Sequence, residues 1–502
     1  MIRFAVNLCF ASVGLLAVFS VDAAVYTVTK TADTNDGICN SDCSLREAIA
    51  AANGTVDNDE IVFALPLFGT TQTITLASGE LTVANNGSVS IDGPGANLLT
   101  VSGNNASRIL VSGANVMVSI EGIRFTAGNG VGAVNSGRGG AIYNVGGTML
   151  LANSILTGNS AANGGALNNA AAASPSVPAN LTIDNCVISN NNSTSSGAAM
   201  QNFSTSTLHI RNSTINNNTT SGTGIAGAFQ ANGTVTITNT TFSGNSAPAG
   251  TGGGLYFNGT SLIMTNSTLA NNTCATGGGG LHRTGTNPTA NVRNTIIALN
   301  TGPAATLDVS GAITSQGNNI VGTVGTSTGW IATDLINTNP MLGTLADNGG
   351  FGMTLLPLTG SPAINAGHNC VVDLSCSASN PPQAVTTDQR GITRPQGPTV
   401  DIGAVEVAAV QANATVSGRV VTSFGQGVFR AYVTISGPGG VIRTAVTNNF
   451  GNFTFKLIPT GQTYTIDVSS KQGGFSPQQV IVNGDVTDIT IMPSDPSLWR
   501  KR

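Results

Sequence analysis

Charge is what this sequence has least of. Only 8% of the 502 residues are charged, against about a quarter in an ordinary globular domain. After Lys30 there is no lysine until Lys456, and the formal net charge is −4. Because nucleic-acid binding depends on basic side chains that neutralise phosphates, we expect no nucleic-acid partner.

Acidic residues are nearly missing from the middle of the chain. Between residues 118 and 300 the only two are Glu121 and Asp184. A glycosidase needs two facing carboxylates, and a calcium-dependent lyase needs clustered carboxylates with a nearby base. The sequence therefore predicts no catalytic residue and no cofactor in this region. Histidine occurs only three times, and we expect His209, at an outward strand position, to be solvated.

Cysteine is scarce but arranged in a pattern. Two close pairs lie in loop-like sequence, and we predict two local disulfides, Cys39–Cys43 and Cys370–Cys376. No further cysteine lies near either pair in sequence, and we predict no metal site. Cys186 and Cys274 are expected to be free thiols.

The N-terminus has the pattern of a secretory signal peptide. Arg3 precedes a mostly apolar stretch, and small residues end it at Ala23. We predict a signal peptide over 1–23 and a secreted or cell-surface protein; a retained membrane anchor is the alternative. No other stretch is long and apolar enough to span a bilayer.

One short pattern recurs from residue 149 to 300. Each copy begins with alternating apolar and polar residues, as in Leu208-His-Ile210, and then has an asparagine. Alternation predicts a strand with one buried face, and a fixed period of about 27 residues predicts a solenoid. Asparagine tolerates the left-handed conformation of a sharp bend, and stacked amides can form a ladder. We predict a structural ladder of the first asparagines: Asn153, Asn185, Asn212, Asn239, Asn266 and Asn294.

The segment before the repeats predicts a cap. Ser44 and Glu47 have capping-box spacing, which indicates a short amphipathic helix over about 45–53 that covers the open end of the solenoid. The words CSLREAI and AAN resemble the N-terminal module named after its CSLREA motif, which begins many exported bacterial β-helix proteins; we assign it to 24–65. Asp33, Asn35 and Asp36 faintly resemble the start of a calcium loop, although the closing Glu is missing.

Residues 66–338 are predicted to be the coils. The paired words GGA[IL] and [FIL]-x-x-N resemble the repeats of chlamydial polymorphic outer-membrane proteins. Residues 339–406, with LLPLTGSPAINAG and the phrase around Gly391, resemble the choice-of-anchor Q domain. That resemblance implies a C-terminal cap and no reaction. The charged residues of this segment either pair to hold the cap, which we favour, or form an active cluster: Asp388, Arg390, Arg394, Asp401 and Glu406.

A linker, 407–413, leads to a second composition. Seven alternating strands follow within about 80 residues, which suggests a β-sandwich over 414–495. The SGRV opening and the turn around Phe450 resemble carboxypeptidase regulatory-like domains, which are transthyretin-like sandwiches without catalytic activity.

The predicted fold is therefore all-β: a right-handed parallel β-helix of the pectin-lyase type with a capping helix and a C-terminal sandwich. We expect an adhesin-like or structural protein that binds glycans, extracellular matrix or cell-surface components. The alternative is a polysaccharide lyase or hydrolase, which would use Glu80, Asp92 and Glu121 or the C-terminal acids. A structural component without a ligand is a third reading.

Overall fold

The computed structural model describes residues 24–84, 87–173, 176–285, 289–376, 381–407, 413–437, 442–460, 462–471 and 473–495. The predicted signal peptide, 1–23, lies outside the described residues. The chain forms two compact units that divide after residue 408, and each is described by itself.

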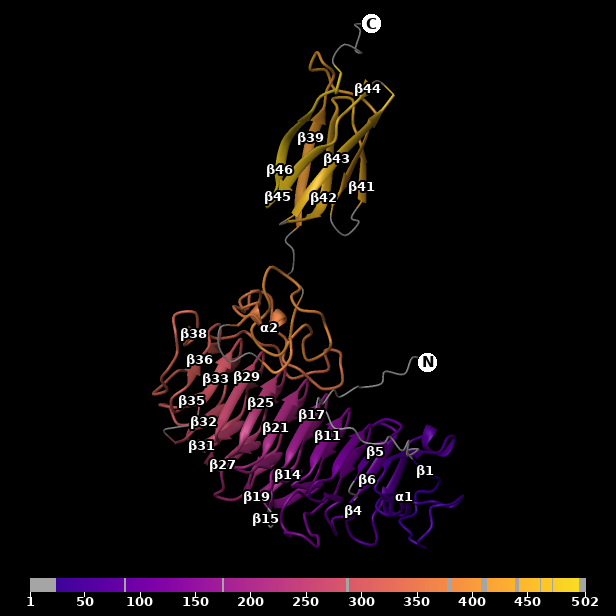
Figure 1. The fold of residues 1–502 in the computed structure, drawn as a ribbon. Coiled ribbons are helices and arrows are strands. Elements are labelled where there is room, and N and C mark those ends of the chain that lie inside the picture. Colours follow the sequence, from indigo (N-terminus) through magenta and orange to yellow (C-terminus); the bar gives the residue numbers. More distant parts are fainter. Residues whose placement is uncertain are drawn as a thin grey trace, which may run out of the picture. The chain divides into compact units, whose positions relative to one another are not determined.

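The first unit is a parallel β-helix in which successive coils add one strand to each sheet (Figure 1). Sheet A has eleven strands: β1 (Val25–Val28), β2 (Asn58–Phe63), β5 (Ser88–Asp92), β8 (Met117–Glu121), β11 (Thr148–Ala152), β17 (Asn180–Asp184), β21 (Thr207–Arg211), β25 (Thr234–Thr238), β29 (Ser261–Thr265), β33 (Thr289–Arg293) and β36 (Thr314–Ser315). Sheet B also has eleven: β3 (Gln72–Thr75), β6 (Leu99–Ser102), β9 (Arg124–Thr126), β12 (Ile155–Thr157), β18 (Val187–Ser189), β22 (Thr214–Asn216), β26 (Thr241–Ser243), β30 (Thr268–Ala270), β34 (Ile296–Ala298), β37 (Ile320–Val321) and β38 (Leu335–Ile336).

Two further sheets complete the coils. Sheet C has nine strands: β4 (Leu81–Val83), β7 (Leu110–Ser112), β10 (Ile142–Val145), β14 (Leu167–Ala170), β20 (Met200–Asn202), β24 (Phe229–Ala231), β28 (Leu255–Phe257), β32 (Leu281–Arg283) and β35 (Val309–Ser310). Sheet D has five: β13 (Ser160–Asn163), β19 (Asn192–Ser196), β23 (Thr219–Thr220), β27 (Ser246–Thr251) and β31 (Thr273–Thr276). Sheet D therefore adds a fourth strand to the coils that contain it. A hairpin, β15 (Ala172–Ala173) and β16 (Ser176–Val177), projects from one coil.

Alternation along each strand forms the core. In β21 the side chains of Leu208 and Ile210 are buried, while His209 between them faces outward. The equivalent positions of successive coils stack in register, so the buried residues form one continuous core along the solenoid.

The six corner asparagines of the predicted ladder all have a positive φ, between 45° and 52°. Their amides bond to one another only in pairs, as in Asn185 to Asn153 and Asn294 to Asn266. Their first role is therefore to make the bend between sheets A and B, which most residues adopt only with strain.

A continuous amide ladder is formed by the second asparagine of each coil, which follows the sheet B strand and points into the core. Each side-chain amide donates to the Oδ1 of the next, over 2.8–3.0 Å, and the last donates to Asp308. Every Oδ1 after the first also accepts the backbone N–H of the previous asparagine. We call this set the buried ladder: Asn159, Asn191, Asn218, Asn245, Asn272 and Asn300.

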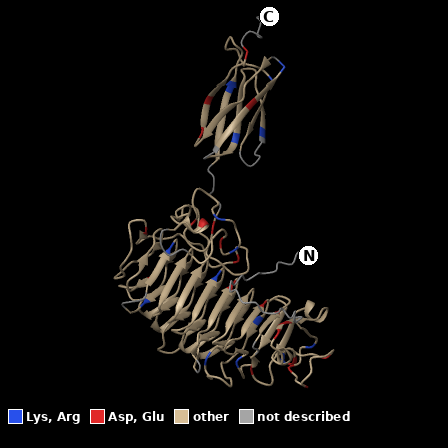
Figure 2. Cartoon of the chain, viewed as in Figure 1, with Lys and Arg blue, Asp and Glu red and all other residues tan. Residues whose placement is uncertain are grey.

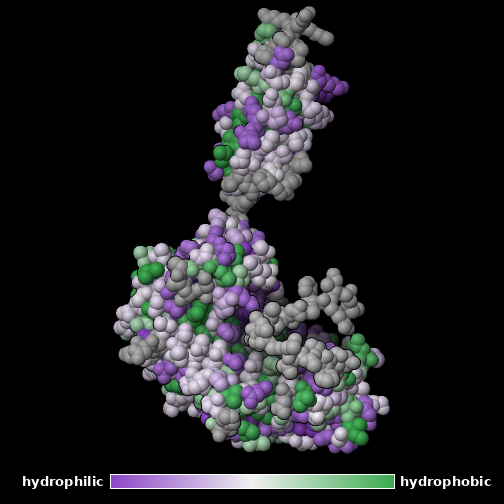
Figure 3. All heavy atoms as spheres, viewed as in Figure 1, coloured by the Kyte–Doolittle hydropathy of each residue, from purple (hydrophilic) through white to green (hydrophobic). Residues whose placement is uncertain are grey.

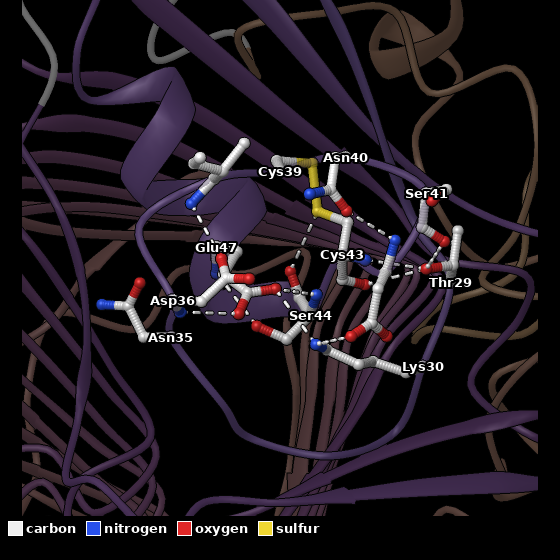
Figure 4. The surroundings of a disulfide bond; sticks show 12 residues. Thr29, Lys30, Asn35, Asp36, Cys39, Asn40, Ser41, Cys43, Ser44 and Glu47 are labelled. Atoms are coloured by element: carbon white, nitrogen blue, oxygen red, sulfur yellow. Dashed lines mark hydrogen bonds and ion pairs between the residues drawn. A yellow bond between two sulfur atoms is a disulfide. The ribbon is translucent and has the colours of Figure 1, made fainter.

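The N-terminal end is covered by helix α1 (Leu45–Ala52), as predicted. The capping box is present: Ser44 Oγ accepts the Glu47 amide over 3.1 Å, and the Glu47 carboxylate accepts the Ser44 amide over 2.7 Å. Figure 4 shows Lys30 reaching Glu47 near the Cys39–Cys43 disulfide. Lys30 also pairs with Asp42 over 3.0 Å. A 3₁₀ turn, η1 (Leu67–Gly69), follows, and its Phe68 is buried.

The sequence predicts that 339–406 caps the far end of the solenoid, but the structure differs: the segment 339–407 folds back along the flank. It lies against the corner between sheets A and B of several coils, and helix α2 (Cys370–Asp373) is part of it (Figure 1). Gln389 contacts Thr214 and Thr241 from two successive coils. At the far end itself, Val324 and Trp330 pack against the core.

The second unit has the predicted strands plus one short addition, β44 (Gly473–Gly474). One sheet contains β39 (Asn413–Val420), β42 (Asn452–Pro459) and β46 (Val486–Ile491). The other contains β40 (Tyr432–Ser436), β41 (Ile442–Val446), β43 (Gln462–Ser470), β44 and β45 (Gln478–Val482). Both contribute residues to one core, including Val416, Val433 and Tyr464.

Candidate functional site

A pocket of about 420 Å³ lies on the outer face of sheet A, beneath the stretch 382–387. Its floor comes from β17, β21 and β25, and its wall from the segment that folds back along the flank. The charges of the molecule are sparse on the coils (Figure 2), so the ionic groups of this pocket stand out. We call it the flank pocket, and its ionisable lining residues are Asp184, His209 and Arg211.

Strand register places the floor residues in two columns. Thr182, His209 and Thr236 are direct partners in one column. Asp184, Arg211 and Thr238 are direct partners in the other. Neighbouring strands lie about 4.8 Å apart, so the floor is a compact grid of hydroxyl, imidazole, carboxylate and guanidinium groups.

Asp184 and Arg211 form an ion pair over 2.8 Å, and both side chains are partly exposed. Arg211 also donates to Gln383 Oε1 over 2.6 Å, which ties the floor to the wall. Asn212 donates to Asp184 over 2.9 Å. The charged groups are therefore held in place before any ligand arrives.

His209 faces outward, as predicted, but it is half-buried in the pocket rather than solvated. Burial lowers the pKa of its imidazole, and the neighbouring Arg211 lowers it further. Its Nδ1 has no hydrogen-bond partner among the described residues. The ring is therefore neutral at pH 7.

The acids of the earlier coils continue the second column. Asp92 and Glu121 are direct register partners, and Asp184 follows two strands later, with Ala152 between. Asp92 and Glu121 precede the recurring pattern of residues 149–300. Among the described residues no group of three or more metal-binding side chains is close enough to hold an ion.

The charged residues of 381–407 are buried within their own segment. Arg394 pairs with Glu406 over 2.7 Å, and both side chains are fully buried. Arg390 pairs with Asp388. Burial raises the pKa of Asp401 to about 6. These residues bond to one another and to the backbone of their own segment, and so hold it together, which is the interpretation the sequence favoured.

The other singled-out residues have structural partners. Both predicted disulfides are present, and Cys186 and Cys274 are buried free thiols. In the loop that resembles a calcium loop, Asp33 pairs with Arg46 and accepts the amides of Ala77 and Ser78. Glu80 pairs with the buried Arg108 over 2.7 Å.

The first unit is thus a right-handed parallel β-helix, and the second unit is a separate β-sheet domain. A family model described as right handed beta helix region matches residues 179–334. A second, described as carboxypeptidase regulatory-like domain, matches residues 415–494.

Two solved structures are similar to this chain at low sequence identity. The pectate lyase Pel9A is 15% identical, covering 77% of this chain and 97% of its own, with a TM-score of 0.38. Jun a 1, the major allergen from cedar pollen, is 16% identical, covering 53% and 72%, with a TM-score of 0.28. A comparison with curated proteins gives no match.

Sequence reasoning missed the flank pocket. The spacing of His209 and Arg211 on one strand face was visible, as was their offset from Asp184 by one coil. What could not be seen is the wall, because residues 382–387 lie about 170 residues further along the chain.

No described helix is long and apolar enough to cross a membrane.

Proposed function

We propose that this chain is an extracellular polysaccharide-binding protein whose β-helix binds a sugar chain at the flank pocket. The supporting observation is the preformed floor, in which an ion pair, a neutral imidazole and threonine hydroxyls lie within a few strands. Sugars present alternating donors and acceptors, and such a grid can match them. The pocket volume falls within the range of about 300–1,000 Å³ typical of ligand sites.

Location outside the cell is part of the proposal. It draws on the signal-like residues 1–23, the two disulfides and the resemblance of 24–65 and 339–406 to modules of exported proteins. Expression of residues 1–502 in a bacterial host should yield exported protein that begins at Ala24, as read by intact mass. Retention of the uncleaved chain in the cytoplasm would contradict it.

The binding test uses purified residues 24–502 and a panel of neutral and acidic polysaccharides, measured by calorimetry. We expect His209→Ala and Arg211→Gln to weaken binding about tenfold or more, as loss of a charged or buried hydrogen bond would. His282→Ala, a half-buried histidine on sheet C, is the matched control and should bind normally. No binding across the panel, or equal loss in the control, would refute the proposal.

A second candidate is polysaccharide cleavage, favoured by one observation: Asp92 and Glu121 are register partners on the outer face of sheet A. Two nearby carboxylates are the usual equipment of a glycosidase. Under this reading wild-type protein releases reducing or unsaturated ends from a polysaccharide, and Asp92→Asn and Glu121→Gln each abolish release. Binding without any released ends would eliminate it.

A further inference from the structure

The second unit has its exposed apolar residues concentrated at one end. The described residues of this unit include eight large hydrophobic side chains that are exposed, and six lie at the end away from residue 413. In Figure 1 this is the end at which β44 is labelled. We call these six the apolar end: Phe424 (58% exposed), Phe429 (44%), Tyr432 (59%), Val446 (52%), Phe450 (69%) and Met492 (60%).

Backbone hydrogen bonds place these residues on one connected group of loops. The loop 422–431 is bound to residue 447, because the Arg430 N–H donates to the Thr447 carbonyl and the Thr447 N–H donates to the Ala431 carbonyl. A Cβ on Gly427 would meet the Phe450 carbonyl carbon at 2.2 Å, so the two loops touch. Tyr432 and Val446 are strand partners, and Met492 follows Ile491, which pairs with Val420.

Phe424 and Phe450, the two aromatic tips of the apolar end, are positioned by tight turns. The Thr422 hydroxyl accepts the amides of Phe424 and Gln426, which fixes the turn that presents Phe424. The Asn448 side chain does the same for Phe450 and Asn452. The rings are therefore held outward by local bonds, which keeps them in water although burial would be more favourable.

Basic side chains accompany the rings. Arg430 lies over the Phe429 ring, with its guanidinium carbon 5.1 Å from the ring centroid. Arg419 donates from Nε to the Phe450 carbonyl over 2.6 Å, so it stands beside the second tip. The described loops and strand ends here carry three basic side chains, including Lys471, and one acidic side chain, Asp495.

We propose that the apolar end is a membrane-docking site that inserts its phenylalanines among the lipids of an anionic phospholipid surface. Phenylalanine has no polar tip to bond a sugar hydroxyl, whereas it gains by entering the headgroup–acyl boundary. Guanidinium groups beside the rings pair with lipid phosphates. The apolar tips and the excess of positive charge thus match the two layers of one bilayer leaflet. This inference does not depend on the polysaccharide site.

The test is sedimentation of residues 24–502 with phosphatidylcholine vesicles, with and without an anionic phospholipid. We expect binding to the anionic vesicles, weakened by added salt and lost about tenfold or more in Phe424→Ser/Phe450→Ser. The matched control, Leu457→Ser/Ile481→Ser, removes two equally exposed apolar side chains at the opposite end and should bind like wild type.

A second variant separates charge from insertion. Arg419→Gln/Arg430→Gln should reduce binding to anionic vesicles and flatten its salt dependence. Melting temperatures show that each variant is folded. Failure of the wild type to sediment with anionic vesicles, or equal loss in the control variant, would overturn the proposal.

Discussion

At the residue scale, two asparagines per coil have different tasks. The corner asparagine supplies a left-handed backbone, while the ladder asparagine satisfies buried polar groups. Sequence analysis could assign the first because a bend needs a residue that tolerates positive φ. It placed the amide ladder at the corner asparagines, which was wrong: the continuous ladder runs through the second asparagine of each coil, because only that side chain points inward.

The ladder asparagine should be the costlier one to change. Asn218 accepts the amide and side-chain N–H of Asn191 and donates to Asn245 and to the Ile188 carbonyl. Asn218→Ala leaves several buried groups without partners, each worth roughly 1–3 kcal/mol, so we expect a lowered urea midpoint. Asn185→Gly keeps the positive φ and loses one amide bond, so it should cost about 1 kcal/mol or less. Equal midpoints for the two variants would contradict this assignment.

Cys186 should be chemically silent in the native chain. Burial raises the pKa of its thiol to about 12, and the thiolate is the reactive form. Iodoacetamide at pH 8 should label it only after denaturation, as followed by mass spectrometry. Stoichiometric labelling of the native protein at this residue would show that the coil opens. Cys186→Ser should fold normally, because the same position of the neighbouring coils holds Ser154 and Ser213.

At the element scale, the strands and α1 were predictable and the flank segment was not. Each strand carries its own alternation, and α1 carries its capping box, so local sequence suffices. The segment 339–407 depends instead on bonds such as Gln389 to Thr214, whose partners are 175 residues apart. Only the folded coils place those partners together, so the expectation of an end cap was wrong.

The flank segment should depend on its buried ion pair. In Glu406→Gln, Arg394 keeps its charge without a full partner, which costs about 3–5 kcal/mol in a buried site. We expect trypsin to cut at Arg390 while the coils stay folded. Asp42→Asn, which alters an exposed pair at the other end, is the control and should leave the digestion pattern unchanged. Resistance of Glu406→Gln at Arg390 would argue against this role.

The same segment should respond to pH through Asp401. Its folded pKa of about 6 lies above the value of 3.8 in an unfolded chain, because burial disfavours the charge. Between these pH values the folded state binds more protons, so this group's contribution falls as pH rises. The melting temperature of Asp401→Asn relative to wild type should therefore increase from pH 4 to pH 7. A constant difference would show that Asp401 ionises normally.

At the scale of the whole molecule, the flank segment brings distant parts of the chain into one site. The flank pocket needs β17 and β21 for its floor and 382–387 for its wall. Figure 3 shows hydrophilic and hydrophobic residues mixed over this face of the first unit. The site therefore exists only when the coils and the segment are aligned.

Removing one coil should test that alignment. Deletion of 213–239 joins Asn212 to Thr240 in the repeat, so the β-helix can still wind, but Gln389 loses one of its two threonine partners. We expect trypsin to reach Arg390 in this variant. Deletion of 154–185, which joins Asn153 to Cys186, removes an earlier coil and should leave Arg390 protected. Protection in both deletions would contradict the prediction.

The flank segment touches one coil after another at fixed steps: Thr214, Thr241, Thr268 and Asn294. The segment therefore fixes the number and spacing of the coils beneath it, with one contact for each turn of the solenoid. Coils that the segment does not contact can be gained or lost. Related chains would therefore differ in the number of N-terminal coils and keep the number of contacted coils constant.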